Sequence, residues 1–175
     1  MKKTITAHCL IKNEENFVGY AIISVIEFVD HIIVFDTGST DKTVDIIQNI
    51  MKEYPGKITF EEKGPCDGKR HTQLRQEMLD KTKTEWFMIL DGDEVWTDRV
   101  LNEAKKTIAE NNDVECLIVP FYLCVGDIYH TSFRKGKIKI AGRTAFHYPR
   151  FIKISPGLHW QGDYNEDRLL DKKNE

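Results

Sequence analysis

Two acidic side chains close together give the sequence its clearest sign of chemistry. Asp91 and Asp93 are separated by Gly92 and directly follow the hydrophobic run WFMIL. If that run is a strand, its period of two sends both carboxylates to one face. Carboxylates so close repel each other unless a cation compensates, and Mg²⁺ or Mn²⁺ prefers carboxylate and phosphate oxygens. The pattern therefore predicts a site for a metal ion and a diphosphate, with a solvated acidic turn as the alternative.

A further carboxylate, Asp36, ends another hydrophobic run and begins the motif Asp-Thr-Gly-Ser. Aspartic proteases carry their catalytic aspartate in this motif, but they need two copies in β-rich surroundings. This chain has one copy with a helical pattern directly behind it, so the protease interpretation is rejected. At the end of a parallel strand, with Gly38 allowing a tight turn, Asp36 is expected to contact a ligand. Ser39 or Thr40 is instead expected to cap the next helix, and Asp41 to favour its positive end.

The elements that must position these carboxylates alternate along the first part of the chain. Hydrophobic runs predict strands at 4–11, 31–36, 57–62 and 85–90. Helical spacing predicts helices from Asn13 as N-cap to about residue 28, over 44–54, and around 74–78 and 101–108. The strands are continuously apolar rather than alternating. This predicts an α/β fold with a mostly parallel, Rossmann-like sheet and helices on both faces.

The rest of the chain changes in character and predicts a smaller β-rich part. Short strand-like pieces follow one another after residue 116, with a turn at 134–137 and a strand pattern at 148–154. The length suits one hydrophobic core, so we expect a single domain over residues 1–175.

Composition limits the classes of partner. The formal net charge of this 175-residue chain is −3 and its basic residues are scattered, so nucleic-acid binding is not expected. The four cysteines show no CxxC spacing, and three of them lie in apolar strand-like runs, where cysteine acts as a small hydrophobe. The start is unlike a signal peptide, and no run approaches the roughly 18 apolar residues of a membrane span. These features favour the cytoplasm.

Four motifs, read together, are similar to those of a known enzyme family. They are CLIKNEEN, IIVFDTGSTDKT, LRQEML and WFMILDGDE, in this order within residues 4–95. This series resembles the inverting nucleotide-sugar glycosyltransferases of family two, which have the A-type fold. It looks most like a bacterial branch that opens with Lys-Asn-Glu-Glu and ends its second strand with Asp-Thr-Gly-Ser-Thr-Asp. The resemblance implies transfer of a sugar from a nucleotide-diphosphate donor, usually a UDP-sugar, to an acceptor hydroxyl with inversion.

The resemblance also implies roles for individual residues. Those that it assigns to nucleotide binding are Ala7, Cys9, Glu14, Asp36, Asp67, Arg75 and Asp91. Among these, Asp36 would contact the base, and Arg75 would reach the base or the phosphates. Asp93 would bind a Mn²⁺ or Mg²⁺ ion that bridges the diphosphate, and Asp91 would contact the ribose or serve the same ion. The ion would act as a Lewis acid on the leaving group.

Transfer also needs a carboxylate that deprotonates the acceptor hydroxyl. The late stretch PRFIKISPGLHWQGDYNED loosely matches the branch, although Asn165 stands where the branch has a histidine. Glu166 matches the late glutamate and is expected to be the catalytic base. Asp163 and Asp167 compete for that role.

The resemblance divides the expected domain into two functional halves. Residues 1–95 would bind the nucleotide sugar, and residues 96–175 would face the acceptor. The acceptor half is short for such enzymes, which suits either a trimmed chain or a minimal enzyme. The acceptor would be a glycan, a lipid-linked molecule or a protein, and the enzyme would act in the cytoplasm or at the inner face of the membrane.

Two other functions remain open from the sequence. The run DGDEV fits the Asp-x-Asp-x-Val motif of haloacid-dehalogenase-type phosphatases, whose first aspartate becomes phosphorylated. That motif normally follows the first strand, whereas here it follows the fourth, and Asp36 would be left without a role. The chain could also bind a nucleotide sugar without turning it over.

Overall fold

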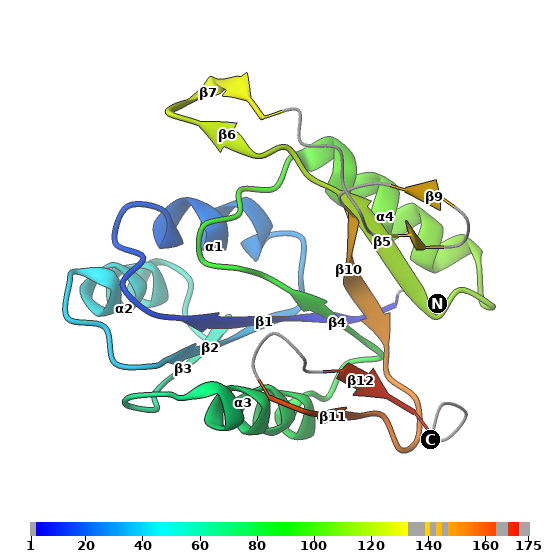
Figure 1. Ribbon diagram of the computed structural model, residues 1–175, viewed down its shortest axis with the longest axis horizontal. Coiled ribbons are helices and arrows are strands. Elements are labelled where there is room, and N and C mark those ends of the chain that lie inside the picture. Colours follow the sequence, from blue (N-terminus) through cyan, green and yellow to red (C-terminus); the bar gives the residue numbers. More distant parts are fainter. Residues whose placement is uncertain (1–2, 133–138, 141–142, 145–146, 164–167, 172–175) are drawn as a thin grey trace.

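A six-stranded sheet forms the centre of the molecule (Figure 1). The computed structural model describes residues 3–132, 139–140, 143–144, 147–163 and 168–171. Its sheet has the order β3-β2-β1-β4-β10-β5. The strands are β1 (Ile5–Ile11), β2 (His31–Asp36), β3 (Ile58–Glu62), β4 (Trp86–Ile89), β5 (Cys116–Pro120) and β10 (His147–Lys153). The first four are parallel and β10 is antiparallel to both of its neighbours, so the predicted mostly parallel sheet is confirmed.

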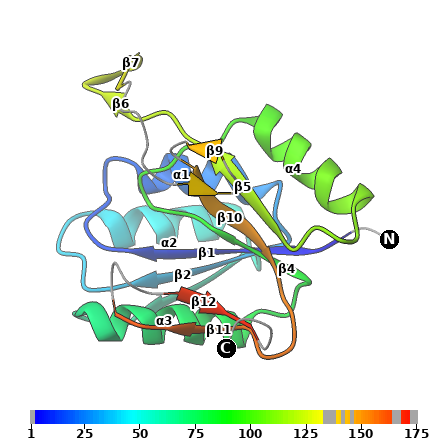
Figure 2. The ribbon, with the colours of Figure 1, turned by 45° about the vertical axis from the view of Figure 1, so that its right-hand side comes forward.

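Helices cover both faces of this sheet, as the continuous apolar strands predict (Figures 1 and 2). The core on one face joins the strands to α1 (Val18–Ile26), α2 (Thr43–Glu53) and α4 (Asp98–Glu110). The opposite face carries α3 (Gly68–Lys81) and the hairpin of β11 (His159–Gln161) and β12 (Arg168–Leu170). Alternate residues of a strand point to opposite faces, so each strand contributes to both cores.

Among the described residues of the later part of the chain, there are three small two-stranded sheets. Besides β11–β12, they are β6 (Cys124–Val125) with β7 (Asp127–Thr131), and β8 (Lys139–Ile140) with β9 (Arg143–Thr144). The prediction of a β-rich later part is therefore confirmed, but β5 and β10 extend the main sheet instead of forming a separate layer. The predicted turn at 134–137 lies outside the described residues.

The loop after β1 differs from its prediction. Asn13 is not a helix N-cap, because α1 begins only at Val18. Asn13 has a φ of 55°, and its Oδ1 accepts a hydrogen bond from the Thr40 N–H at 2.8 Å. The Asn13 N–H in turn donates to the Ser39 Oγ at 2.8 Å. These bonds tie the loop after β1 to the loop after β2, and this tertiary pairing replaces the expected cap.

The start of α2 also differs in detail. Its N-cap is Lys42, so neither Ser39 nor Thr40 caps the helix as expected. Asp41 does lie at the helix start, where its Oδ1 accepts from the Thr43 N–H at 3.0 Å. The hydroxyl of Ser39 instead donates a hydrogen bond to Asp36 in the turn after β2, so it does not cap α2.

The cysteines fit the prediction only in part. Cys9 is buried in β1, but Cys116 and Cys124 are exposed, so the expectation of small buried hydrophobes is wrong for these two. Cys116 starts the edge strand β5 and Cys124 lies in the β6–β7 hairpin, where one or both faces remain open to solvent. In the part of the chain that the structure describes, no helix is both long and apolar enough to cross a membrane.

Candidate active site

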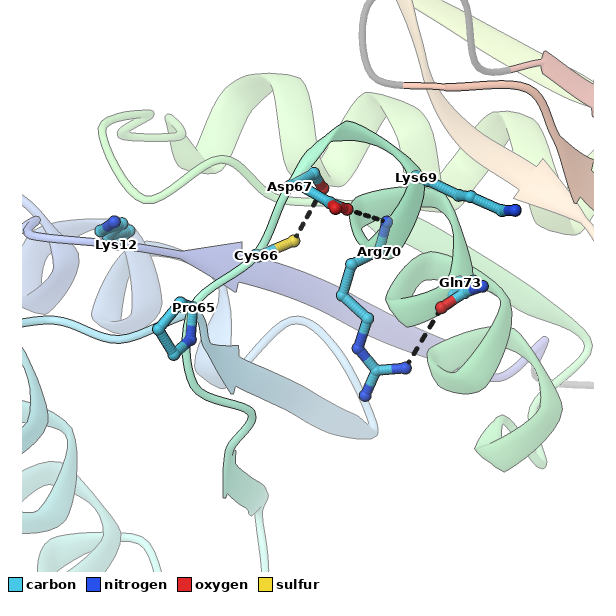
Figure 3. A pocket seen from close by; sticks show the side chains of 7 residues that line it. All are labelled: Lys12, Pro65, Cys66, Asp67, Lys69, Arg70 and Gln73. Carbon is cyan, nitrogen blue, oxygen red and sulfur yellow. Dashed lines mark hydrogen bonds between the residues drawn. The ribbon is translucent and has the colours of Figure 1, made fainter.

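A cleft of about 810 Å³ opens at the carboxyl ends of β1 and β4. The turn after β4 forms part of its floor, and α3, β10 and the β11–β12 hairpin provide its walls. A second hollow of about 710 Å³ adjoins it through Lys12, between the loop before α3 and the first turns of that helix (Figure 3). Ligands of open parallel sheets bind at this edge, beyond the carboxyl ends of the strands.

The turn after β4 carries the two predicted metal ligands into the cleft. The Leu90 N–H donates to the His8 carbonyl at 3.0 Å, which keeps the end of β4 beside β1. The Glu94 N–H donates to the Asp91 carbonyl at 3.1 Å and closes the turn. Asp91 and Asp93 both line the cleft, but β4 ends at Ile89, so they lie in the turn beyond the strand and the period-of-two argument does not apply to them.

Gly92 is required here by the close approach of β1 and the loop behind it. A Cβ at this position would lie 2.9 Å from Glu14 Cγ and 2.9 Å from Ile11 Cγ2. The Glu14 side chain therefore packs across the turn and lines the same cleft. Burial raises the pKa of Glu14, and the negative charges of Asp93, Asp41 and Asp91 raise it further.

Two residues of the site were not identified from the sequence: Arg150 and Glu94. Arg150 extends from β10, and only 8% of its surface is exposed. Its Nη2 donates to Asp91 Oδ2 at 2.9 Å and to Glu94 Oε1. Burial raises the pKa of Glu94 to about 7, although the Arg150 charge opposes that shift. The local signal for Arg150 is its place next to the aromatic Phe151 in the late stretch PRFIKISPGLHWQGDYNED.

The donors at this turn suit a hard divalent ion that has other ligands as well. Asp91 is about half exposed and Asp93 is exposed, so both offer carboxylate oxygens to the cleft. Within the described ranges, no three His, Cys, Asp or Glu side chains converge as a metal site. Mg²⁺-type ions are commonly held by one or two carboxylates together with phosphates and waters. The residues present therefore fit an ion that a diphosphate helps to bind.

Asp36 organises the turn after β2. Only 2% of its surface is exposed, and its Oδ2 accepts from the Gly38 N–H and the Ser39 N–H, both at 2.9 Å. The Ser39 hydroxyl donates to Oδ1. Gly38 has a φ of 93° and packs against Pro65, which lines the second hollow. A carboxylate has about four acceptor positions and the turn uses three, so one is left for another donor.

Arg75 lies on the wall of the cleft that α3 provides. Its guanidinium stacks over the Trp160 ring, 4.8 Å from the ring centroid. The backbone N–H of Trp160 donates to Gln76 Oε1 at 2.8 Å, which fixes the β11–β12 hairpin against the helix. The structure therefore places Arg75 in the cleft, where the sequence predicts a contact with the base or phosphates.

His8 lies at the floor of the cleft between the sheet and α3. Its Nε2 is 2.6 Å from Thr82 Oγ1, and its ring stacks on Phe87 with centroids 4.7 Å apart. Burial lowers the pKa of His8 to about 3, with a further lowering by the charge of Arg75. His8 is thus a neutral ring at neutral pH and supports the wall of the cleft.

The remaining predicted residues lie in different places. Ala7 and Cys9 are fully buried in the core, so neither has surface open to the cleft. Asp67 is the N-cap of α3, and its carboxylate accepts from the Arg70 N–H at 2.8 Å beside the second hollow (Figure 3). Asp163 is exposed and follows β11. Glu166 and its competitor Asp167 lie outside the described residues.

The fold has counterparts among solved structures. S. aureus TarS 1–349 superposes with a TM-score of 0.54 and 16% sequence identity, over 67% of this chain and 34% of that chain. The mannosyltransferase PcManGT from Pyrobaculum calidifontis, in complex with GDP-Man and Mn²⁺, gives a TM-score of 0.53 and 20% identity over 66% of this chain and 35% of that chain. These likenesses show that the α/β sheet with its helices is a glycosyltransferase A-type fold.

Sequence comparison identifies the family directly. The chain is 26% identical over 147 residues to the SPbeta prophage-derived glycosyltransferase SunS of Bacillus subtilis (strain 168). This match includes 80% of the chain and 33% of SunS, so the chain spans about a third of the length of the curated relatives that it matches. The model of the family described as glycosyl transferase family 2 matches residues 10–159. With most of its length covered by that model, this chain belongs to glycosyl transferase family 2.

Proposed function

We propose that this chain transfers a sugar from a nucleotide-diphosphate sugar to an acceptor hydroxyl with inversion. The observation that carries the proposal is the Asp91–Asp93 turn, which opens into the cleft at the carboxyl ends of β1 and β4. Family membership supports glycosyl transfer, and the cleft volume of about 810 Å³ lies in the range of small-molecule sites. The phosphatase alternative loses support, because the model of glycosyl transferase family 2 matches residues 10–159 and because DGDEV follows the fourth strand rather than the first.

The donor diphosphate would lie against the turn after β4. Asp93 and Asp91 would hold a Mn²⁺ or Mg²⁺ ion, which supplies Lewis-acid stabilisation of the leaving diphosphate. A divalent ion also accompanies GDP-Man in the mannosyltransferase of the same fold. Arg75, on the opposite wall, adds a fixed positive charge within the cleft.

The nucleoside would occupy the hollow beside Lys12, between Pro65 and the start of α3. Asp36 starts the turn after β2, and a Cβ at Gly38 in that turn would lie 3.4 Å from the nitrogen of Pro65, which lines the hollow. Its remaining acceptor position suits the imide N–H of uracil, so we propose a UDP-sugar as donor. Asp67 would support nucleotide binding indirectly, because its carboxylate caps α3 and so fixes the loop that lines this hollow.

The acceptor hydroxyl would attack the anomeric carbon from the side opposite the diphosphate. The new bond joins the acceptor oxygen to that carbon, the bond to the diphosphate oxygen breaks, and the hydroxyl proton passes to a carboxylate. Glu166 is our proposed base, with Asp163 as the described alternative beside the β11–β12 hairpin. A base of this kind contributes roughly 10²- to 10⁴-fold to the rate. The acceptor would be a glycan, a lipid-linked molecule or a protein, met in the cytoplasm or at the inner face of the membrane.

The decisive experiment distinguishes loss of a metal ligand from loss of a negative charge elsewhere on the chain. Titration calorimetry of UDP with Mn²⁺ should show binding to the wild-type protein and at least about tenfold weaker binding to Asp93→Asn. Asp98→Asn, which removes an exposed carboxylate from the first turn of α4, is the matched control and should bind normally. Equal affinity in Asp93→Asn and wild type would refute the metal assignment.

A transfer assay then distinguishes an enzyme from a binding module. With UDP-sugars and a panel of acceptors, the wild type should release UDP faster than hydrolysis alone, and Glu166→Gln should lose transfer while keeping UDP affinity. Binding of UDP without turnover by any acceptor would favour a non-catalytic nucleotide-sugar module.

A further inference from the structure

The turn after β4 concentrates negative charge around the buried guanidinium of Arg150. Asp91, Asp93 and Glu94 belong to this turn, and the Glu14 side chain packs against Gly92 within it. Glu14, Asp91 and Asp93 all line the same cleft. Arg150 is the single buried Lys or Arg among the residues that the structure describes.

The geometry of Arg150 makes it a bridge between two of these carboxylates. Its Nη2 serves both Asp91 Oδ2 and Glu94 Oε1, across 59 and 56 residues of sequence. The other oxygen of Glu94, Oε2, is buried and has no hydrogen-bond partner in the described part of the chain. The guanidinium therefore compensates the cluster only in part, and it occupies oxygens that a divalent ion would otherwise attract.

We propose that Arg150 is a resident counter-ion that keeps the affinity of the empty turn for a free divalent ion low. The ion then binds together with the donor diphosphate rather than ahead of it. This inference rests on the proposed function, because it concerns the same metal and diphosphate site.

Two physical effects act in the same direction. First, an ion that approaches Asp91 must compete with a charge-assisted hydrogen bond that is already formed at 2.9 Å. Second, the positive charge of Arg150 repels a divalent ion that lies within a few ångströms of it. Even at the permittivity of water, this repulsion lowers the affinity for the ion at least about tenfold. The donor diphosphate brings its own negative charges and oxygens, which offset that repulsion.

The test measures binding of Mn²⁺ alone, by calorimetry and by the electron paramagnetic resonance signal of free Mn²⁺. Arg150→Gln keeps an amide that can donate to the carboxylates but removes the charge, and it should bind Mn²⁺ at least about tenfold more tightly than wild type. Arg150→Lys keeps the charge and should remain close to wild type. Lys153→Gln is the matched control, because it removes a charge from the same strand at the far end of β4 and should change nothing.

A weaker or unchanged affinity of Arg150→Gln for Mn²⁺ would overturn the inference. If that variant unfolds without metal, added Mn²⁺ should refold it, as followed by circular dichroism, and failure to refold would also overturn the inference. The proposed function has a separate readout in wild-type protein, namely UDP binding in the presence of Mn²⁺. If the wild type binds UDP with Mn²⁺ and Arg150→Gln gains no affinity for the free ion, only the role of Arg150 is wrong.

Discussion

The buried ring of His8 should make the free energy of unfolding depend on pH in a predictable direction. Its pKa is lowered from 6.5 to about 3 in the folded protein, because the ring is only 6% exposed and lies between Phe87 and Thr82. The unfolded chain therefore binds a proton at a higher pH than the folded chain does. The contribution of His8 to the free energy of unfolding is fully present above pH 6.5 and is lost as the pH falls toward 3.

The size of the effect follows from the two pKa values. As the pH falls from 7.5 to 5, His8 binds nearly one proton in the unfolded chain and almost none in the folded protein. This difference lowers the free energy of unfolding by about 2 kcal/mol. For a domain of this size, that is a fall in melting temperature of about 4–8 °C. His8→Gln keeps a group that can pair with Thr82 but does not titrate, so it should lack this component.

The assay is thermal or urea unfolding of both proteins at several pH values, analysed as the difference between them. The difference cancels other groups, including Glu94, whose raised pKa has the opposite sign and stabilises the fold as the pH falls through about 7. We expect wild type to lose about 2 kcal/mol relative to His8→Gln over this range. A difference that stays constant with pH would show that His8 titrates alike in both states and would refute the reasoning.

Two further predictions concern the turns that shape the cleft. Gly92→Ala should cost about 1–3 kcal/mol and weaken donor binding, because its Cβ would lie 2.9 Å from side-chain atoms of Glu14 and Ile11. Gly19→Ala in α1, whose Cβ would lie an ordinary 3.4 Å from Ile46 Cγ2 of α2, should be neutral or stabilising in the same melting experiment. Equal effects of the two changes would contradict the crowding argument. Asp36→Asn should abolish a preference for UDP over CDP in calorimetry, whereas Asp41→Asn, altered at the neighbouring helix start, should keep it. A preference that survives in Asp36→Asn would assign base recognition elsewhere.

Local patterns in the sequence predict the framework of the cleft well. The carboxylates of Asp91 and Asp93 could be located because a continuous apolar strand, a glycine and two acidic residues lie within one short stretch. The helices α2, α3 and α4 likewise follow from apolar spacing that each helix satisfies by itself. These features depend on residues that are close together in the chain, so a single sequence is enough to predict them.

Features that depend on distant pairing could not be predicted in this way. The sequence predicts a strand at 148–154, close to β10, but nothing in that pattern indicates that the strand lies between β4 and β5. The contact of Arg150 with Asp91 follows from that placement alone. Asn13 shows the same limit, since its polar side chain satisfies the general rule for a cap but bonds to the loop after β2.

The placement of β10 has a consequence for how the protein is made on the ribosome. The strands β1 to β4 emerge first, yet the outer edge of β4 stays unpaired until the residues of β10, synthesised some 60 positions later, arrive beside it. An open edge of an apolar strand is a template for pairing with other chains. A nascent chain that stalls after β5 would also leave Asp91 and Glu94 without Arg150. Interrupted translation should therefore yield aggregation or degradation by quality control rather than a smaller folded protein that still binds its ligand.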